Sequence, residues 1–256
     1  MTVKNVKNYS STIKSGIDLL RCFSHSEPVI GNKRLSELLD LPPSTVARIT
    51  NTLCDLGLLN KAPHERKYQL GYGVLKLGYP VIANMPERHI ARNWMKELTD
   101  KSLGQTSMAV LDNFDAVYVE SFRPEEQWLS IPEIGTTRPV LYTAIGHALL
   151  YSLDKQKFNY LMNIFQSKYK GSANKIISDI KASFSQINEC GYCIIRGTYR
   201  KELHAVGVPL TPPNHPDPIA LNLSLRVQSG RHPNLEKYAK QLIEVKNKTL
   251  AALHTS

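Results

Sequence analysis

The segment from Pro43 to Leu56 constrains the fold most, because it has the pattern of an amphipathic helix. Its apolar residues are spaced by three, four and three positions and share one helix face: Val46, Ile49, Leu53 and Leu56. Pro43 stands where the first helical turn tolerates proline, and Gly57 stands where glycine commonly ends a helix. The segment is therefore predicted to bury one side and to leave a polar side free.

The polar side of this predicted helix carries groups that suit the major groove of DNA. Arg48 can contact guanine with two hydrogen bonds, and Asn51 can do the same for adenine. Ser44 and Thr45 stand at the helix N-terminus, where hydroxyls and backbone amides can meet a phosphate. Thr52 shares this side. We predict that all five residues contact DNA, although a solvated surface helix would show the same pattern.

The neighbouring segments strengthen the DNA-binding interpretation. Apolar spacing predicts a helix from Ser11 to Phe23 and a shorter one from Asn32 to Leu39, followed by a tight turn. After Gly57, Leu58–Lys61 and Lys67–Gly71 read as two strands around a polar turn. The order helix, helix, turn, helix, hairpin is that of a winged helix-turn-helix. Three basic residues would place the hairpin over the DNA backbone: Lys61, Arg66 and Lys67.

The charge of the chain also favours a polyanionic partner in its first third. The 256 residues carry a formal net charge of +10. Residues 1–78 hold eleven Lys or Arg and six Asp or Glu, so that half of the surplus lies in less than a third of the chain. Nucleic acid is the usual partner of such a basic region, although a basic soluble enzyme would show the same net charge.

The remainder of the chain is predicted to form an α+β sheet domain. Helices are expected at 87–103, 143–153, 155–165, 174–190 and 235–253, and strands at 106–111, 116–121, 129–131, 193–195, 205–210 and 219–226. We therefore predict a DNA-binding domain over residues 1–71, a linker with a short helix over 72–86, and a second domain over 87–256. Gly73 and Gly78 suggest a jointed linker.

Several motifs together resemble the IclR-type transcriptional regulators. The stretch LSELLDLPPSTVARITNTLCDLGLLNK, followed by YQLGYGVLKLG, resembles the N-terminal half of that family. In the second half, four further stretches resemble family motifs in the expected order: 138–148, Gly191-Tyr192, 208–210 and 220–224. The resemblance spans residues 11 to 253, and its specificity comes from the order and spacing of the motifs.

The resemblance implies a GAF-like effector-binding domain, a homodimer or homotetramer, and DNA binding controlled by a small molecule. The family's pocket positions fall on seven residues of this chain: Ala144, Ile145, Ile195, Leu203, Ala205, Asn222 and Ser224. The chain departs from the family pattern at His147, where lysine is usual, and at residues 195–198, where acidic residues are frequent.

The residues themselves suggest the chemistry of such an effector. Asn222 and Ser224 are two positions apart on one predicted strand, so both can point to the same side. Arg196 and Arg200 would favour a carboxylate if either turned toward the pocket. We therefore expect a small organic or aromatic acid, unless the two polar residues and the two arginines face solvent.

Other functions remain as alternatives. Cys190 and Cys193 form a C-x-x-C, but the pair ends a predicted helix instead of starting one, which favours packing over redox or metal chemistry. The sequence has no phosphate loop, nucleophile elbow or zinc-binding helix motif, so no catalytic residue, metal or cofactor is expected. A metabolic enzyme, a sensor domain without specific DNA binding and a protein-interaction adaptor are the competing classes.

The sequence as a whole predicts a DNA-binding transcriptional regulator. It has neither a membrane span nor a secretory signal, and its few cysteines suit a reducing compartment, so a cytoplasmic location is expected. Two DNA-reading heads in a dimer would match a pseudo-palindromic operator.

Overall fold

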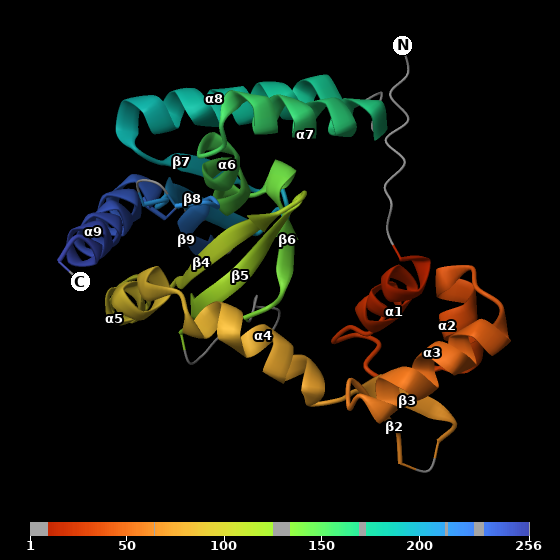
Figure 1. Ribbon diagram of the computed structural model, residues 1–256. Helices are drawn as coiled ribbons and strands as arrows, with labels where there is room; N and C mark the ends of the chain where they lie inside the picture. Colours follow the sequence, from red (N-terminus) through yellow and green to blue (C-terminus); the bar gives the residue numbers. More distant parts are fainter. Residues whose placement is uncertain are drawn as a thin grey trace. The chain divides into compact units, whose positions relative to one another are not determined.

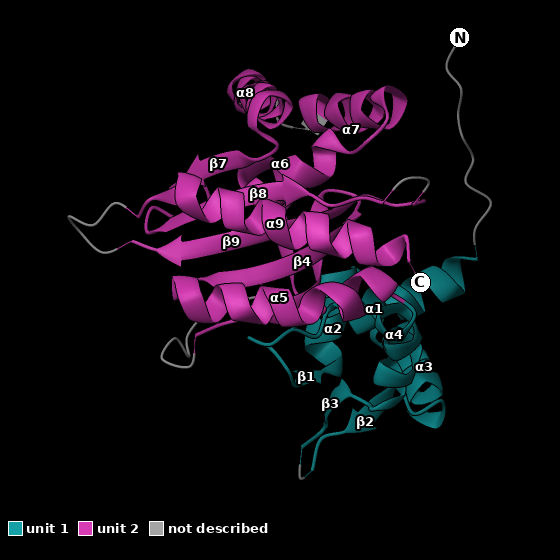
Figure 2. Ribbon diagram, turned by 90° about the vertical axis from the view of Figure 1, so that its left-hand side faces the viewer, with its two compact units in different colours: residues 1–84 teal, residues 85–256 magenta. Residues whose placement is uncertain are grey.

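The computed structural model describes residues 10–63, 65–124, 134–168, 173–212, 215–227 and 233–255. The chain divides into two compact units, residues 1–84 and 85–256 (Figure 2). Each unit has its own hydrophobic core. The strand predicted at 129–131 lies outside the described residues.

Three helices form the body of unit 1: α1 (Ser11–Arg21), α2 (Asn32–Leu39) and α3 (Pro43–Asp55). The Ser10 side chain accepts a hydrogen bond from the backbone amide of Ile13 and caps α1. Asp40 ends α2 in the left-handed conformation (φ 52°), which sets the turn into α3. Apolar residues of the three helices pack into one core: Leu19, Leu35, Val46, Ile49 and Leu53.

A three-stranded antiparallel sheet completes the winged helix-turn-helix that the sequence predicts. It contains β1 (Ile30–Gly31), β2 (Leu59–Lys61) and β3 (Lys67–Leu70) in the order β1-β3-β2. Strand β1 is absent from the sequence prediction, because two residues are too few to show an alternating pattern. After β3, a side chain at Gly71 would place its Cβ 2.3 Å from the carbonyl oxygen of Gly57, so glycine is required there.

The segment predicted as a jointed linker is mostly helical. Helix α4 spans Gly73–Ala83, and α5 begins at Pro86. A Cβ at Gly73 would lie 2.6 Å from the carbonyl oxygen of Gly57, so this glycine serves close packing beside the wing. The prediction that Gly73 is a free joint is therefore wrong. Gly78 has open space around it.

A six-stranded antiparallel sheet forms the centre of unit 2, in the order β6-β5-β4-β9-β8-β7. Its strands are β4 (Gln105–Asp112), β5 (Asp115–Phe122), β6 (Thr137–Pro139), β7 (Cys193–Arg196), β8 (Leu203–Pro209) and β9 (Ile219–Arg226). The antiparallel pairing of all six strands, with helices packed on the sheet, confirms the predicted α+β class.

The two faces of the sheet carry different helices (Figure 1). On one face lie α5 (Pro86–Ser102) and α9 (Leu235–Leu253), which contact each other and the strands. On the other lies α6 (Ala144–Tyr151), preceded by the 3-10 turn Val140–Tyr142 and covered by α7 (Lys155–Lys168) and α8 (Ala173–Cys190). We call these the α5/α9 face and the α6 face.

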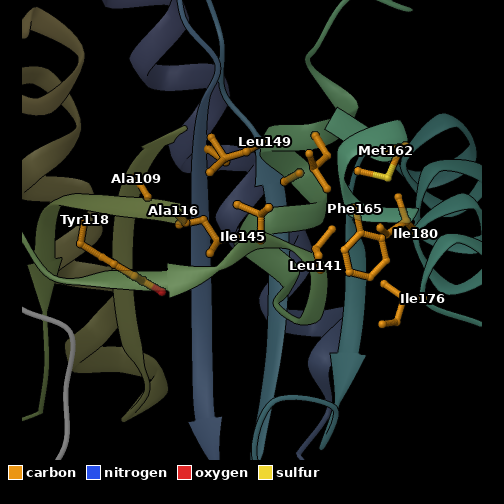
Figure 3. Packing of buried hydrophobic residues seen from close by; sticks show 14 of the residues in the cluster. Ala109, Ala116, Tyr118, Leu141, Ile145, Leu149, Met162, Phe165, Ile176 and Ile180 are labelled. Carbon is orange, nitrogen blue, oxygen red and sulfur yellow. The ribbon is translucent and has the colours of Figure 1, made fainter. Parts of the chain in front are cut away.

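The main core of unit 2 lies on the α6 face. Ile145 and Leu149 of α6 pack with Phe165 of α7, and Tyr118 and Ala109 of the sheet close the cluster (Figure 3). The N-terminal turn of α6 touches the sheet at Gly207, where a Cβ would lie 2.1 Å from the carbonyl oxygen of Ala144. Helix α6 therefore starts directly above β8.

Candidate DNA-binding surface and effector-binding face

Helix α3 presents the predicted polar residues at its surface. Ser44, Arg48, Asn51 and Thr52 are exposed, and Thr45 is half-buried. Buried on the opposite side are Val46, Ile49, Thr50 and Leu53. Leu56 follows the helix and is 64% exposed, so the prediction that it joins the buried face is wrong. Thr50, which was not predicted to be buried, belongs to the buried side of α3. Its hydroxyl donates a hydrogen bond to the backbone carbonyl of Ala47.

The hairpin after α3 carries three exposed cations. Lys61 lies at the end of β2, Arg66 directly precedes β3, and Lys67 begins it. The ammonium of Lys67 forms an ion pair with the carboxylate of Glu65 at 2.6 Å. Exposed pairs of this kind hold their partners weakly, so the pair leaves Lys67 able to contact a phosphate. The same unit thus exposes the polar face of α3 and a basic hairpin.

The predicted effector-binding residues come from several strands of unit 2. Ile195, Ala205 and Ser224 are direct partners across β7, β8 and β9, so their side chains share the α6 face. All three are half-buried. Leu203 lies two residues before Ala205 and has the same orientation. We call Ile195, Ala205, Ser224 and the next partner, Gln105, the outer row.

A second row lies two residues further along the same strands, closer to α6. This inner row consists of Cys193, Gly207, Asn222, Ser107 and Ser121, which pair in that order across five strands. Asn222, the remaining predicted pocket residue of β9, is 5% exposed. The structure therefore brings five of the seven predicted residues onto one face of the sheet.

The other two predicted residues are at the start of α6, and they point to different places. Ala144 packs with Cys193, Ile195 and Ala205, beside the two rows. Ile145 is 1% exposed and packs in the main core with Leu149 and Tyr118 (Figure 3). Ala144 therefore adjoins the rows, while Ile145 supports α6 from within.

Three polar residues of the rows were absent from the sequence prediction: Gln105, Ser107 and Ser121. The amide nitrogen of Gln105 donates to the hydroxyls of Ser107 (3.1 Å) and Ser121 (2.9 Å), and the two hydroxyls lie 3.0 Å apart. Gln105 and Ser107 alternate along β4 as Asn222 and Ser224 do along β9. That matching alternation was the available signal, but only strand pairing places the two strands side by side.

The expected carboxylate-binding role of Arg196 is wrong for a geometric reason. Arg196 follows Ile195 in β7 and therefore points to the α5/α9 face, where its guanidinium pairs with the Glu236 carboxylate at 3.0 Å. Two other guanidinium groups lie over the ring of Tyr199, which follows β7. The distances to the ring centroid are 5.7 Å for Arg138 and 5.8 Å for Arg200.

Arg138 lies on the same side as the rows. It pairs with Ala116 in the ladder of β5 and β6, and Ala116 belongs to the core cluster on the α6 face. Burial raises the pKa of the Tyr118 hydroxyl far above its usual value, although nearby Arg138 opposes the shift. Tyr118 is therefore a neutral hydroxyl beside a cation on this face.

His147, the departure from the family pattern, is buried in α6. Its Nδ1 lies 2.7 Å from the Ser183 hydroxyl and its Nε2 lies 3.1 Å from the Leu141 carbonyl oxygen. A carbonyl only accepts, so Nε2–H donates to Leu141 and the Ser183 hydroxyl donates to Nδ1. Burial lowers the pKa of His147. The neutral ring therefore ties α6 to α8.

The two cysteines of the C-x-x-C have different surroundings. Cys190 is exposed at the end of α8, while Cys193 is buried and its thiol donates to the Ala144 carbonyl at 3.5 Å. Burial raises the pKa of Cys193 to about 12, so its thiol stays protonated near neutral pH. Cys193 acts here as a packing residue. Across the described ranges, no three His, Cys, Asp or Glu side chains gather closely enough to hold a metal ion.

Comparison with known families decides the identity of the chain. Residues 12–63 match the family described as the IclR helix-turn-helix domain, and residues 80–249 match the bacterial transcriptional regulator IclR C-terminal family. The chain belongs to the IclR family. It is a transcriptional regulator with a helix-turn-helix DNA-binding segment and a C-terminal effector-binding domain, as the resemblance in the sequence predicted.

Curated relatives of this IclR-family chain carry regulator names. The HTH-type transcriptional regulator TsaQ1/TsaQ2 of Comamonas testosteroni is 27% identical over 215 residues, covering 83% of this chain and 77% of the relative. The HTH-type transcriptional regulator XynR of Escherichia coli is 24% identical over 226 residues, covering 88% and 89%. The relatives are regulators and not enzymes by name.

Solved structures show the same fold along almost the whole chain. An IclR family transcriptional regulator from Brucella abortus superimposes with a TM-score of 0.83 at 25% identity, covering 95% of this chain and 92% of that one. An IclR homolog from Microbacterium hydrocarbonoxydans, complexed with 4-hydroxybenzoate, gives a TM-score of 0.78 at 17% identity, covering 96% and 100%. In the described part of this chain, no helix is both long and apolar enough to cross a membrane.

Proposed function

We propose that this IclR-family regulator binds a pseudo-palindromic operator as a homodimer or homotetramer, and that a small organic or aromatic acid controls the binding. The α3 residues would read base edges, with the wing cations on the adjacent phosphates. The effector would occupy the outer and inner rows on the α6 face of unit 2. The exposed polar face of α3 beside a basic hairpin is the observation that carries the proposal.

Helix α4 supports the homodimer. A helix that is apolar on all sides is normally buried against a partner. In the single chain, however, no residue of α4 is buried, and its large apolar side chains are strongly exposed: Leu75 at 67%, Leu77 at 66%, Tyr79 at 67% and Val81 at 64%. A second copy of the chain would cover this surface and would hold two DNA-reading heads together.

An acidic effector is supported by three observations. Helix α6 begins above Gly207, so the positive end of its dipole lies beside the inner row. Arg138 lies on the same face of the sheet, and Arg200 shares the ring of Tyr199 with it. The structural relative bound to 4-hydroxybenzoate shares this fold. In this proposal, Arg138 and Arg200 take the role that the sequence had given to Arg196 and Arg200.

Selection of DNA by the full chain tests the proposal. A random duplex pool should yield an inverted repeat, with half-sites about one helical turn apart. The affinity for that duplex should fall steeply between low and moderate salt, because each neutralised phosphate releases counterions. A pool without enrichment, or an affinity that ignores salt, would instead favour an enzyme or a sensor without specific DNA binding.

A further inference from the structure

The inner row of the α6 face holds a group of neutral polar side chains that the core does not require. Ser107 and Ser121 face each other across β4 and β5, and Gln105 donates to both hydroxyls. Ser107 and Gln105 are each at most 8% exposed. Small apolar residues would fill the same positions without any need for hydrogen bonds. Replacing both partners of a buried hydrogen bond by apolar groups of the same shape can leave stability almost unchanged, so stability alone does not explain this group.

Asn222 supplies a second, independent observation in the same row. It lies directly opposite Ser107 in the ladder of β4 and β9 and is 5% exposed. Among the residues that the structure describes, none donates a hydrogen bond to its Oδ1. A buried acceptor without a partner costs about 1–3 kcal/mol. The row therefore contains an acceptor that a ligand can satisfy, beside hydroxyls that can accept or donate.

We infer that Asn222, Ser107 and Ser121 recognise a hydroxyl group, and that the effector is a hydroxylated acid. This inference rests on the proposed function, because it names the class of acid that the α6 face takes. A carboxylate has no proton to donate to Oδ1 of Asn222, whereas a hydroxyl donates one hydrogen bond and accepts another. The hydroxyl donates to Oδ1 of Asn222 and accepts from a serine hydroxyl of the row.

The hydroxyl and the carboxylate of the effector would bind at different places. The inner row is neutral, while the cations Arg138 and Arg200 lie near Tyr199. An acid without a hydroxyl leaves Oδ1 of Asn222 desolvated and unpaired when it fills the site. A site built around a hydrogen bond rejects an analogue that lacks the bonding group, because the buried partner is then left alone.

Matched acids that differ by hydroxyl groups test the inference. Calorimetry on the full chain compares 4-hydroxybenzoate with benzoate, and glycerate with propionate. At least one hydroxylated acid should bind about tenfold more tightly than its partner, as expected for one well-made hydrogen bond in a buried site. Equal affinity within both pairs, or no binding of either hydroxylated acid, would overturn the inference.

Substitutions in the inner row show which residues produce the preference for the hydroxylated acid. Asn222→Ala should reduce the preference for the hydroxylated acid to within about twofold. Ser121→Ala, at a half-buried position, should also reduce the preference and serves if Asn222→Ala fails to fold. An unchanged preference in a folded variant of Asn222 would contradict the inference.

The control is Thr106→Val, one residue from Ser107 in the same strand. Thr106 is fully buried and hydrogen-bonded to Thr99, on the α5/α9 face. This change removes a buried hydroxyl from the wrong side of the sheet, so it should lower stability and leave the preference unaltered. Loss of the preference in Thr106→Val would show that the effect comes from general destabilisation and would overturn the assignment to the row.

A third arm distinguishes failure of this inference from failure of the proposed function. Glycerol carries the hydroxyls of glycerate without its charge. If glycerol binds as tightly as glycerate, the hydroxyl site stands and the acidic effector fails. If propionate binds as tightly as glycerate, and benzoate as tightly as 4-hydroxybenzoate, the acidic effector stands and the hydroxyl site fails. Neither result alters the expected binding of α3 to DNA.

Discussion

The two candidate binding surfaces differ in how the chain builds them. The polar residues of α3 lie within nine consecutive positions, 44–52, and most are exposed. The rows of unit 2 join residues as distant as Ser107 and Asn222, which are partners only because β4 and β9 pair. A surface helix can change its contacts without changing its fold. A buried row cannot, so substitutions there affect both stability and binding.

The largest effect on stability is expected from a substitution of Gly207 in the inner row. In Gly207→Ala, the new Cβ would meet the Ala144 carbonyl oxygen at 2.1 Å, and neither backbone can yield easily. We expect unit 2 to lose roughly 4 kcal/mol or more of stability, as in the most severe overpacking changes. Hydrogen exchange should show lost protection in β7, β8 and α6 and unchanged protection in α1–α3.

Gly16→Ala is the matched control in unit 1. Gly16 lies inside α1, where a new Cβ would have no other group within 4 Å, and alanine is the better helix former. Protection in α1 should therefore rise, by up to about 1 kcal/mol. If Gly207→Ala reduced the stability of unit 2 no more than the control reduces that of unit 1, the two surfaces would not differ in how they tolerate substitution.

The buried charge on the α5/α9 face gives the second effect. Glu120 is 3% exposed and lies 3.1 Å from the Arg88 guanidinium, which also donates to the Val119 carbonyl. Glu120→Gln keeps the shape but leaves a buried cation without its countercharge, which costs about 3 kcal/mol. Denaturant unfolding measures the loss.

The control for this change is Glu236→Gln, which removes the carboxylate paired with Arg196. Both partners are more than half exposed, and such pairs contribute about 1 kcal/mol or less. Equal losses of stability in the two variants would mean that the Glu120 pair is not sequestered from water.

Local patterns predicted which polar residues of α3 are exposed, and pairing at a distance explains what they missed in unit 2. Helical spacing placed Arg48 and Asn51 on the exposed side of α3, because the neighbours three and four residues away define that face. The serines of the inner row have no such local signal, since their partners come from other strands. Alternation along β7 could have excluded Arg196, because Ile195 and Arg196 cannot both point to one face.

The role of Gly73 was also predicted wrongly, because its decisive contact is with a residue that is distant in the sequence. Composition suggested that Gly73 loosens a linker, but the contact that requires this glycine comes from Gly57, across the wing. A sequence pattern shows that glycine is permissive, and only the fold shows whether space or flexibility is used.

Acid should weaken unit 2 through His147. Its folded pKa is lowered from 6.5 by burial, so above pH 6.5 the neutral ring contributes its full stability. As the pH falls below 6.5, the unfolded chain binds a proton that the folded chain resists, and stability is lost. Thermal unfolding between pH 7.5 and 5 should reveal the decline.

His147→Gln isolates this contribution from the other histidines. Glutamine keeps a donor and an acceptor but does not titrate in this range. The difference in melting temperature between the two proteins should therefore shrink as the pH falls. A difference that is constant with pH would show that His147 is not the group responsible.

The smallest effect concerns the wing. Lys61→Ala should weaken binding to every duplex by a similar factor and reduce the slope of log affinity against log salt by about one, with no loss of stability. Fluorescence anisotropy with two unrelated duplexes measures both quantities. A change confined to one duplex would instead make Lys61 a base contact.

Arg48→Ala tests the central claim most directly, through the ratio of affinities for the selected operator and a scrambled duplex. If α3 reads bases, the variant should lose about 1–3 kcal/mol for the operator, while its affinity for the scrambled duplex changes little. If both affinities fall equally, Arg48 contacts only phosphate. If neither falls, the exposed face of α3 is not the surface that this regulator places on DNA.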